Sequence, residues 1–534
     1  MKDMAMKPLL ACLLLFLTWL PSLSIAEEDV RAGALLEALD VRSFADKGEA
    51  ISELAISEDP RTRYWLNALL DGSLQRTHEG RFVVVLNNRG RSWPVEDALT
   101  QEDLGEISRR ELNRISINNS LRNQIRSLIA VADLYSEDLS LRRASAERLV
   151  GEVDEALAEF LAEHIEQETD RRVQQRLSLA LAIYQLEQGE LDAVAELHGS
   201  LNTDARIALS RAAAQEENPL LAQEAQAALS AIEQRLKMNR TAETLYFGLS
   251  MGSVLVLAAI GLAITFGVMG VINMAHGELI MLGAYTTWAM QQLLPGQPGL
   301  ALLLSIPAGF MVSGLVGIAM ERGVIQFLKG RPLETLLATF GISLMLQQLV
   351  RTVISPQNRT VVTPEWMSGS LVVNDALSLT LNRLYIMAFA LLVFMALIYI
   401  LRRTRLGLEV RAVTQNRAMA RSMGIKATRV DMMTFGLGSG VAGLAGVALS
   451  QLTNVGPNLG QAYIIDSFMV VVFGGVGNLW GTLVAGMSLG IINQVIEPWA
   501  GAVVAKILVL VFIILFIQKR PRGLFPQKGR AAGD

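Results

Sequence analysis

The sequence predicts an all-α protein in two parts, an exported soluble domain followed by a polytopic bundle of about eight to ten transmembrane helices. The first observation is a split in charge, because residues 27–240 hold 39 Asp and Glu against 25 Lys and Arg, whereas residues 241–534 hold 11 against 20. The second is that residues 241–534 are almost continuously apolar. Such segregation is typical of an acidic soluble domain joined to a membrane domain with basic edges.

Residues 1–26 are expected to form a signal peptide. Two lysines precede the apolar run Leu9–Leu20, and Ser24-Ile25-Ala26 has the small-x-small pattern of a cleavage site. An uncleaved first membrane helix is the alternative, and both interpretations place the residues that follow outside the cytoplasm. Cys12, the only cysteine, lies within this segment, so the mature chain is expected to contain no disulfide.

Residues 27–240 are expected to form the extracytoplasmic domain, built mainly from amphipathic helices. Ala-rich pieces that begin at Arg142, Arg176 and Arg206 recur at repeat-sized intervals, which favours a HEAT-like stack of helix pairs. Arg81–Leu86, followed by Asn-Asn-Arg-Gly, predicts one strand and a turn. The three histidines of this part lack metal-ligand spacing, so binding or scaffolding is expected rather than catalysis.

Residues 241–534 are expected to form the membrane domain, which begins after a linker near Lys237–Thr244. The nine expected crossings are 245–269, 274–294, 300–320, 334–354, 384–401, 433–452, 462–477, 479–497 and 500–517. With the soluble domain in the periplasm, an odd number of crossings places the C-terminus in the cytoplasm, and the basic clusters agree with this orientation. The run 462–477 is short and ends in glycines, so it is the candidate for a broken or re-entrant helix. The spaced glycines of 436–446 predict close helix packing.

Polar side chains interrupt the apolar run 245–294 near its middle. An amide, an imidazole and a carboxylate are costly against lipid, so they must face other helices or water, which makes this segment a candidate solute pathway. The candidate pathway residues are Asn273, His276, Glu278, Thr339, Ser343 and Asn454. His276 and Glu278 are two residues apart and do not share a helical face, so a gating or structural role is expected for them.

The string Gly270-Val-Ile-Asn-Met-Ala-His-Gly-Glu278 resembles the first membrane segments of the permeases of branched-chain amino acid and urea ABC importers. Within that family, residues 321–343 and 363–369 are most similar to the permeases of urea importers, as is the exported extension. The resemblance implies a bacterial inner-membrane complex of two homologous permeases, two ABC ATPases and a periplasmic urea-binding protein. It implies transport by alternating access, with no cofactor, metal or nucleic acid.

Residues 402–431 form a basic loop with eight Lys or Arg and two acids, and Ala412–Met423 has good helical propensity. The loop resembles the coupling loop of the same permease family, which docks on the ATPase. The residues that this resemblance assigns to ATPase coupling are Arg411, Asn416, Met419, Ala420, Met423 and Gly424. Gly424 is expected to end the helix. The alternative is an ordinary positively charged cytoplasmic loop.

The chain is not expected to be an enzyme. It contains no Gly-Lys dipeptide and hence no Walker A site, so any ATP must be hydrolysed by another subunit. Urea is neutral and rich in hydrogen-bonding groups, and it needs amides and hydroxyls along its route rather than a fixed counter-charge. Branched-chain amino acids or short amides are the alternative solutes. A membrane sensor with an exported ligand-binding domain is the alternative of another class, although only residues 518–534 follow the last predicted span.

Overall fold

The computed structural model describes residues 32–41, 43–56, 59, 61–215 and 218–525, so the expected signal peptide and Cys12 lie outside the described residues. The chain divides into two compact units, Met1–Gln234 and Arg235–Asp534. Helices predominate among the described residues, as the sequence predicts.

The first unit contains an antiparallel sheet in the order β4-β3-β2-β1-β5. Its strands are β1 (Leu74–Thr77), β2 (Phe82–Val85), β3 (Ser92–Asp97), β4 (Asp103–Ser108) and β5 (Leu112–Arg114). The sequence predicted only the strand that became β2. The sheet packs with helices α3 (Phe44–Ile56) and α4 (Thr62–Asp71), where the buried Trp65 donates a hydrogen bond from Nε1 to the carbonyl oxygen of Ala98 at 2.6 Å.

Six helices follow the sheet, and aspartate or asparagine side chains cap the N-termini of five of them. They are α5 (Asn119–Leu134), α6 (Leu139–Leu149), α7 (Glu155–Gln167), α8 (Arg171–Glu187), α9 (Asp192–Leu197) and α10 (Thr203–Ala213). The three Ala-rich pieces lie in α6, α8 and α10, and α8 packs against both of the others. This packing is what a helical repeat requires, while the HEAT family itself stays a prediction.

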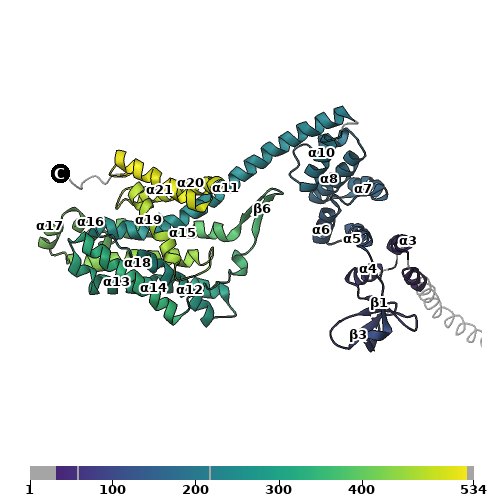
Figure 1. The fold of residues 1–534 in the computed structure, drawn as a ribbon, viewed down its shortest axis with the longest axis horizontal. Coiled ribbons are helices and arrows are strands. Elements are labelled where there is room, and N and C mark those ends of the chain that lie inside the picture. Colours follow the sequence, from purple (N-terminus) through teal and green to yellow (C-terminus); the bar gives the residue numbers. More distant parts are fainter. Residues whose placement is uncertain (1–31, 42, 57–58, 60, 216–217, 526–534) are drawn as a thin grey trace, which may run out of the picture. The chain divides into compact units, whose positions relative to one another are not determined.

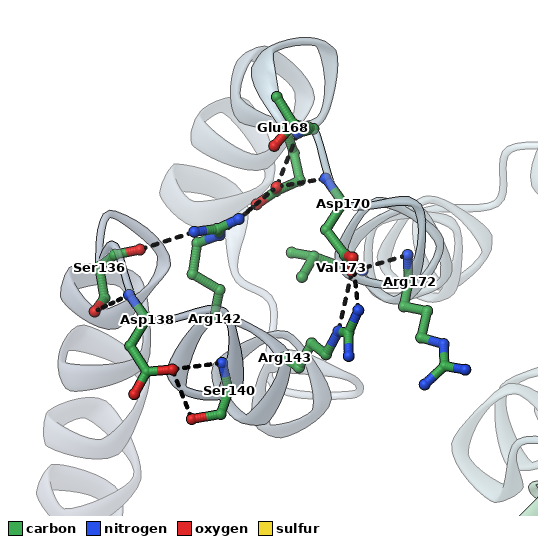
Figure 2. Close-up of polar contacts among 10 residues, drawn as sticks. Ser136, Asp138, Ser140, Arg142, Arg143, Glu168, Asp170, Arg172 and Val173 are labelled. Atoms are coloured by element: carbon green, nitrogen blue, oxygen red, sulfur yellow. Dashed lines mark hydrogen bonds and ion pairs between the residues drawn. The ribbon is translucent and has the colours of Figure 1, made fainter.

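Figure 2 shows how α6 and α8 are held together. Asp170 caps α8 by accepting hydrogen bonds from the backbone of Arg172 and Val173, and it also pairs with Arg143 of α6 at 2.7 Å. The neighbouring Arg142 pairs with Glu168 at 3.3 Å. Both arginines therefore join α6 to the short segment between α7 and α8.

Helix α11 runs from Pro219 to Met269 without a break. The expected linker near Lys237–Thr244 lies within this helix, close to the boundary between the two units at Gln234 and Arg235. Residues 220–247 contain no Gly or Pro and are rich in Ala, Leu, Glu and Gln, which favour a continuous helix.

Each predicted crossing coincides with a helix of the second unit or with α11 (Figure 1). The long helices after α11 are α12 (His276–Leu293), α13 (Pro298–Gly323), α14 (Pro332–Val353), α15 (Leu381–Arg403), α18 (Ala427–Leu449), α19 (Leu459–Gly474), α20 (Leu479–Ala500) and α21 (Ala502–Lys519). Among the described residues, 7 helices are long and apolar enough to cross a membrane. Helix α12 is too polar to meet that standard, and α19 has only 16 residues.

Shorter elements connect these helices. They are η2 (Ile325–Leu328), η3 (Glu365–Met367), the hairpin β6 (Ser370–Asn374) and β7 (Leu377–Thr380), α16 (Arg405–Gln415) and α17 (Arg417–Ser422).

Helices α12, α13 and α18 form the centre of the second unit, and the predicted close packing of the glycines in 436–446 is confirmed. A Cβ atom at Gly446 would lie 1.9 Å from the carbonyl oxygen of Ile280 in α12. A Cβ atom at Gly443 would lie 2.4 Å from the carbonyl oxygen of Gly309 in α13. Only glycine lets these backbones approach so closely.

Candidate functional site

The candidate site begins where the chain breaks between α11 and α12. Helix α11 ends at Met269, Gly270 follows with φ +67°, and α12 begins at His276. In the break, the Asn273 side-chain oxygen accepts a hydrogen bond from the backbone N–H of Ala275 at 3.0 Å. The side chains of Asn273, His276 and Glu278 are all at most 1% exposed. Non-helical backbone of this kind is tolerated in a membrane protein only where protein or water covers it.

A stripe of polar side chains lies along α14 at four-residue spacing. Its members are Thr335, Thr339, Ser343 and Gln347, and each is at most 4% exposed. Residues four apart share one face of a helix, so this face of α14 is polar and buried. The other side of α14 exposes large apolar residues such as Leu337 and Met345. The helix is thus polar toward the protein and apolar outside, which suits a lipid environment.

Hydrogen bonds join this stripe to two places, the break before α12 and the first turn of α12 itself. One carboxylate oxygen of Glu278, Oε1, accepts from Ser343 Oγ at 3.0 Å and from Gln347 Nε2 at 2.7 Å. The backbone N–H of Met274 donates to Thr339 Oγ1 at 3.1 Å. The structure therefore brings Glu278, Thr339 and Ser343 of the expected pathway together, with Asn273 next to Met274.

Each of Asn273, His276 and Glu278 has one polar side-chain atom without a partner within the described part of the chain. Next to the stripe these are the amide nitrogen Nδ2 of Asn273, a donor, and the second carboxylate oxygen of Glu278, Oε2, an acceptor; the third is His276 Nδ1. Unpaired buried polar atoms are costly and call for an explanation. A solute that carries both a carbonyl oxygen and N–H groups could satisfy both kinds of atom.

His276 and Asn454 make no contact with the stripe in the described part of the chain. The ring nitrogen Nε2 of His276 contacts the carbonyl oxygen of Ala258 in α11 at 2.8 Å, so this nitrogen carries the hydrogen and donates. His276 thus fastens the start of α12 to α11, which agrees with the structural role expected for it. Asn454 is exposed in the loop between α18 and α19.

Gln347 was not among the expected pathway residues, yet it makes the shortest contact with Glu278. The signal that identifies it is the repeat of Thr, Thr, Ser and Gln at 335, 339, 343 and 347, which the sequence already contains. Because α14 is otherwise strongly apolar, a four-residue polar period marks the face that must be covered by protein.

The basic loop folds as two helices rather than one. Helices α16 and α17 are separated at Asn416, whose φ of −150° and ψ of 100° are extended, so the expected continuous helix Ala412–Met423 is wrong. Asn416 caps α17, because its side-chain oxygen accepts from the backbone N–H of Met419 at 2.9 Å. An asparagine that caps in this way competes with helix propagation.

Gly424 ends α17 as expected. It adopts φ +89°, and its N–H donates to the carbonyl oxygen of Arg421 at 3.0 Å. The N–H of Ile425 donates to the carbonyl oxygen of Ala420, also at 3.0 Å. These two bonds form a Schellman motif, and the left-handed conformation at its C′ position favours glycine.

The expected coupling residues divide into exposed and supporting positions. Met419 and Met423 are 62% and 77% exposed, whereas Ala420 is 5% exposed and packs in a cluster with Val413 and Val430. Ala420 therefore supports the loop from beneath instead of presenting a contact surface, which corrects the expectation for this residue. The Arg411 guanidinium donates to the carbonyl oxygen of Leu401 and holds α16 against the end of α15.

A pocket of about 530 Å³ lies beside this loop, between α11, α15, α16 and the turn before α20. Arg402, Arg411 and Gln415 are among the residues that line it, and no residue of the stripe does. The stripe side chains are at most 4% exposed, so a solute could contact them only if α14 or the segment opposite it moved.

A bundle of long apolar helices with a broken helix and a buried polar stripe defines a multi-pass membrane transport protein. The comparisons agree, because residues 244–517 match the family described as branched-chain amino acid transport system / permease component. This match covers more than half of the chain, so the protein belongs to that permease family. It is accordingly a membrane permease component without an ATPase site of its own.

Individual relatives match the same part of the chain. The high-affinity branched-chain amino acid permease LivH of Escherichia coli strain K12 is 28% identical over 292 residues, which are 53% of this chain and 94% of LivH. The permease BraD of Pseudomonas aeruginosa is 28% identical over 287 residues, 52% of this chain and 93% of BraD. The ribose import permease RbsC of E. coli K12 is 26% identical over 266 residues, 48% of this chain and 78% of RbsC. No solved structure matches.

Proposed function

We propose that the protein is the permease subunit of a binding-protein-dependent ABC importer, and that its solute is urea. The observation that favours urea as the solute is the pair of unpartnered atoms beside the stripe, Asn273 Nδ2 and Glu278 Oε2. Urea offers a carbonyl oxygen to the first and N–H groups to the second. The hydroxyls of Thr339 and Ser343 and the amide of Gln347 provide further neutral groups that can exchange hydrogen bonds with such a solute.

A zwitterionic amino acid makes a different demand. The carboxylate of the amino acid needs a cation when it leaves water. The stripe consists of neutral groups, and the charged group bonded to it, Glu278, is itself a carboxylate. Arg351 continues the four-residue spacing beyond Gln347, but its Nη2 donates to Asn458 Oδ1 at 2.7 Å. Branched-chain amino acids remain the second candidate, because LivH and BraD carry them by name.

The energy source and the partners follow from the same proposal. One of the two ATPases would dock on the exposed Met419 and Met423 of the basic loop, and a second homologous permease would complete the membrane part and bind the other ATPase. A periplasmic urea-binding protein would deliver the solute. In this arrangement the basic loop and the C-terminus lie in the cytoplasm, and residues 27–240 lie in the periplasm, in keeping with the excess of bases in the loop.

The test is solute uptake by the complete complex in proteoliposomes that contain ATP. Radiolabelled urea and radiolabelled leucine are supplied in parallel, each with its binding protein, and a non-hydrolysable ATP analogue is the control. We expect urea to accumulate only with ATP and leucine not to accumulate. Accumulation of leucine without urea would establish the second candidate, and no ATP-dependent accumulation of either solute would contradict the importer.

A further inference from the structure

Four charged side chains, two of them buried carboxylates, form a network at the end of the second unit that carries the basic loop. Asp431 and Glu321 are both 1% exposed. The ammonium group of Lys329 lies 2.6 Å from Asp431 Oδ2 and 3.2 Å from Glu321 Oε1. The guanidinium of Arg417 also pairs with Asp431 Oδ2. Buried carboxylates are costly without partners, so these contacts are held firmly.

The network joins segments that are distant in sequence. Arg417 is the first residue of α17, in the basic loop, and Asp431 lies in the second turn of α18. Lys329 lies between η2 and α14, and Glu321 is near the end of α13. Asp431 is the one member that contacts both α17 and the segment that leads into α14.

Helix α14 is packed less tightly against its neighbours than α12, α13 and α18 are against one another. Helices α12, α13 and α18 meet through glycines whose backbones touch, and such contacts do not slide. Helix α14 instead contacts its neighbours through hydrogen bonds: Thr339 accepts one from Met274, and Ser343 and Gln347 donate to Glu278. Large apolar side chains of α14 are exposed. Gly330, with φ +83°, precedes it and provides a flexible joint.

We propose that Asp431 is a positioning residue that transmits displacement of α17 to α14, and thereby links ATP hydrolysis to opening of the polar stripe. The inference rests on the proposed function and names the residue through which the basic loop acts. When α17 moves with the ATPase, Arg417 shifts Asp431, and Lys329 carries the shift into the start of α14. The hydrogen bonds that Ser343 and Gln347 donate to Glu278 then break, and these side chains bond to other partners.

The experiment compares Asp431→Asn with the wild type in the complete complex in proteoliposomes. The quantity measured is the number of ATP molecules hydrolysed per molecule of radiolabelled urea taken up. We expect this ratio to rise about fivefold or more, the lower end of typical coupling between two sites. Asp431→Glu, which retains the charge, should restore a ratio near that of the wild type.

Asp466→Asn is the matched control. Asp466 of α19 is also almost fully buried and pairs with a lysine, Lys506 of α21, at 3.0 Å, but within the described part of the chain it has no contact with the basic loop. Both substitutions should lower thermal stability, yet only Asp431→Asn should raise the ATP-to-urea ratio. A merely structural role for Asp431 predicts the same unchanged ratio for both.

An unchanged ratio in Asp431→Asn, with a wild type that couples hydrolysis to uptake, would overturn the inference. If Asp431→Asn does not accumulate in the membrane, Arg417→Gln decides instead, since Arg417 is partly exposed and its loss is milder. A raised ratio in Arg417→Gln supports the inference and a normal one contradicts it. Failure of the wild type to couple ATP to uptake would contradict the proposed function itself.

Discussion

At the scale of single residues, the proposed solute route depends on polar atoms that the fold buries without satisfying. Glu278 uses one oxygen for Ser343 and Gln347 and leaves the other unpartnered, and Asn273 leaves an N–H donor unpartnered among the described residues. Folded proteins seldom leave such atoms without a hydrogen-bond partner, because each costs free energy when buried. In the proposed route, the passing solute supplies the missing hydrogen bonds.

Asn273→Leu should therefore slow urea uptake. The substitution removes a donor and places an apolar side chain in the route, at a cost of about 1–3 kcal/mol per lost hydrogen bond, or roughly tenfold to a hundredfold in rate. The measurement is the initial rate of urea uptake at equal expression. Asn454→Leu, in an exposed loop, is the control and should leave the rate unchanged. Undiminished uptake in Asn273→Leu would show that Asn273 has a structural role and does not line the route.

Asp170 offers a test in the first unit. Its hydrogen-bonded pair with Arg143 lowers the pKa of the Asp170 carboxyl from 3.8 to about 2 (Figure 2). Because the pKa is lower in the folded state, this carboxylate stabilises the fold above the unfolded pKa, and its contribution is lost as the pH falls through about 2.

Hydrogen exchange of α8 at pH 5, 3 and 2 can detect this contribution in the intact protein. We expect wild-type protection of the first turn to fall between pH 3 and 2. In Asp170→Asn that protection should already be lower at pH 5 and should change less with pH. Asp138→Ala, which removes the corresponding cap of α6, should affect α6 only. Identical pH profiles for wild type and Asp170→Asn would contradict the assignment.

At the scale of elements, rigid and mobile helices differ in what lies between them. Glycines bring α18 into backbone contact with α12 and α13, while α14 meets its neighbours through side-chain hydrogen bonds. Close-packed backbones have one arrangement, but hydrogen bonds between polar side chains can exchange partners. This contrast assigns the movement to α14.

Gly446→Val should prevent α12 and α18 from packing, because its Cβ atom would lie 1.9 Å from a backbone oxygen. Gly341→Val is the matched control, since a Cβ atom at Gly341 of α14 meets nothing within 4 Å. The measurement is the yield of monodisperse complex after detergent extraction. We expect near-complete loss for Gly446→Val and normal yield for Gly341→Val. Equal yields would contradict the division into packed and mobile helices.

Met423→Glu should weaken docking of the ATPase while leaving the permease folded. Met423 is 77% exposed at the end of α17, and a charge at the centre of an apolar contact is costly on binding. Copurification of the ATPase with the tagged permease measures docking. Met238→Glu, on a similarly exposed part of α11, should retain the ATPase. Full retention by Met423→Glu would exclude α17 from the docking surface.

The elements that the sequence predicted best are those with a single strong signal. A long apolar run dictates a membrane helix, so every expected crossing has its helix, and Gly424 ends α17 because the φ of its position favours glycine. Six of the seven strands that the structure describes were missed, because strands of three to six residues with mixed polarity carry little periodicity. The break at Asn416 was missed because capping by a side chain outweighs helical propensity there.

Contacts between distant segments could not be predicted in the same way. The sequence separated polar residues from apolar ones within the spans, but it did not show that Glu278 would meet Ser343 and Gln347, 65 and 69 residues away. It also offered no reason to join Arg417 and Lys329 through Asp431. Such pairings depend on how helices pack, which tertiary structure alone determines.

At the scale of the whole molecule, the second unit covers the polar stripe of α14. The stripe is buried, and the pocket beside the basic loop does not reach it. A permease that works by alternating access must expose this stripe to water in at least one state of its cycle. The central claim is that the α14 stripe lines the solute route, and access to the stripe therefore tests it.

The direct measurement is the reaction of a thiol introduced at position 343 with a small water-soluble thiol reagent. Ser343→Cys is made with Cys12→Ser, which removes the only natural cysteine, and the complete complex is tested without nucleotide, with ATP and with a trapped nucleotide. Ser305→Cys is the control, because Ser305 is fully buried in α13 and its hydroxyl bonds to its own helix. We predict that the thiol of Ser343→Cys reacts in at least one nucleotide state, that urea slows the reaction, and that the thiol of Ser305→Cys stays unreactive throughout. A Ser343→Cys thiol that never reacts in a complex still active in uptake would contradict the claim.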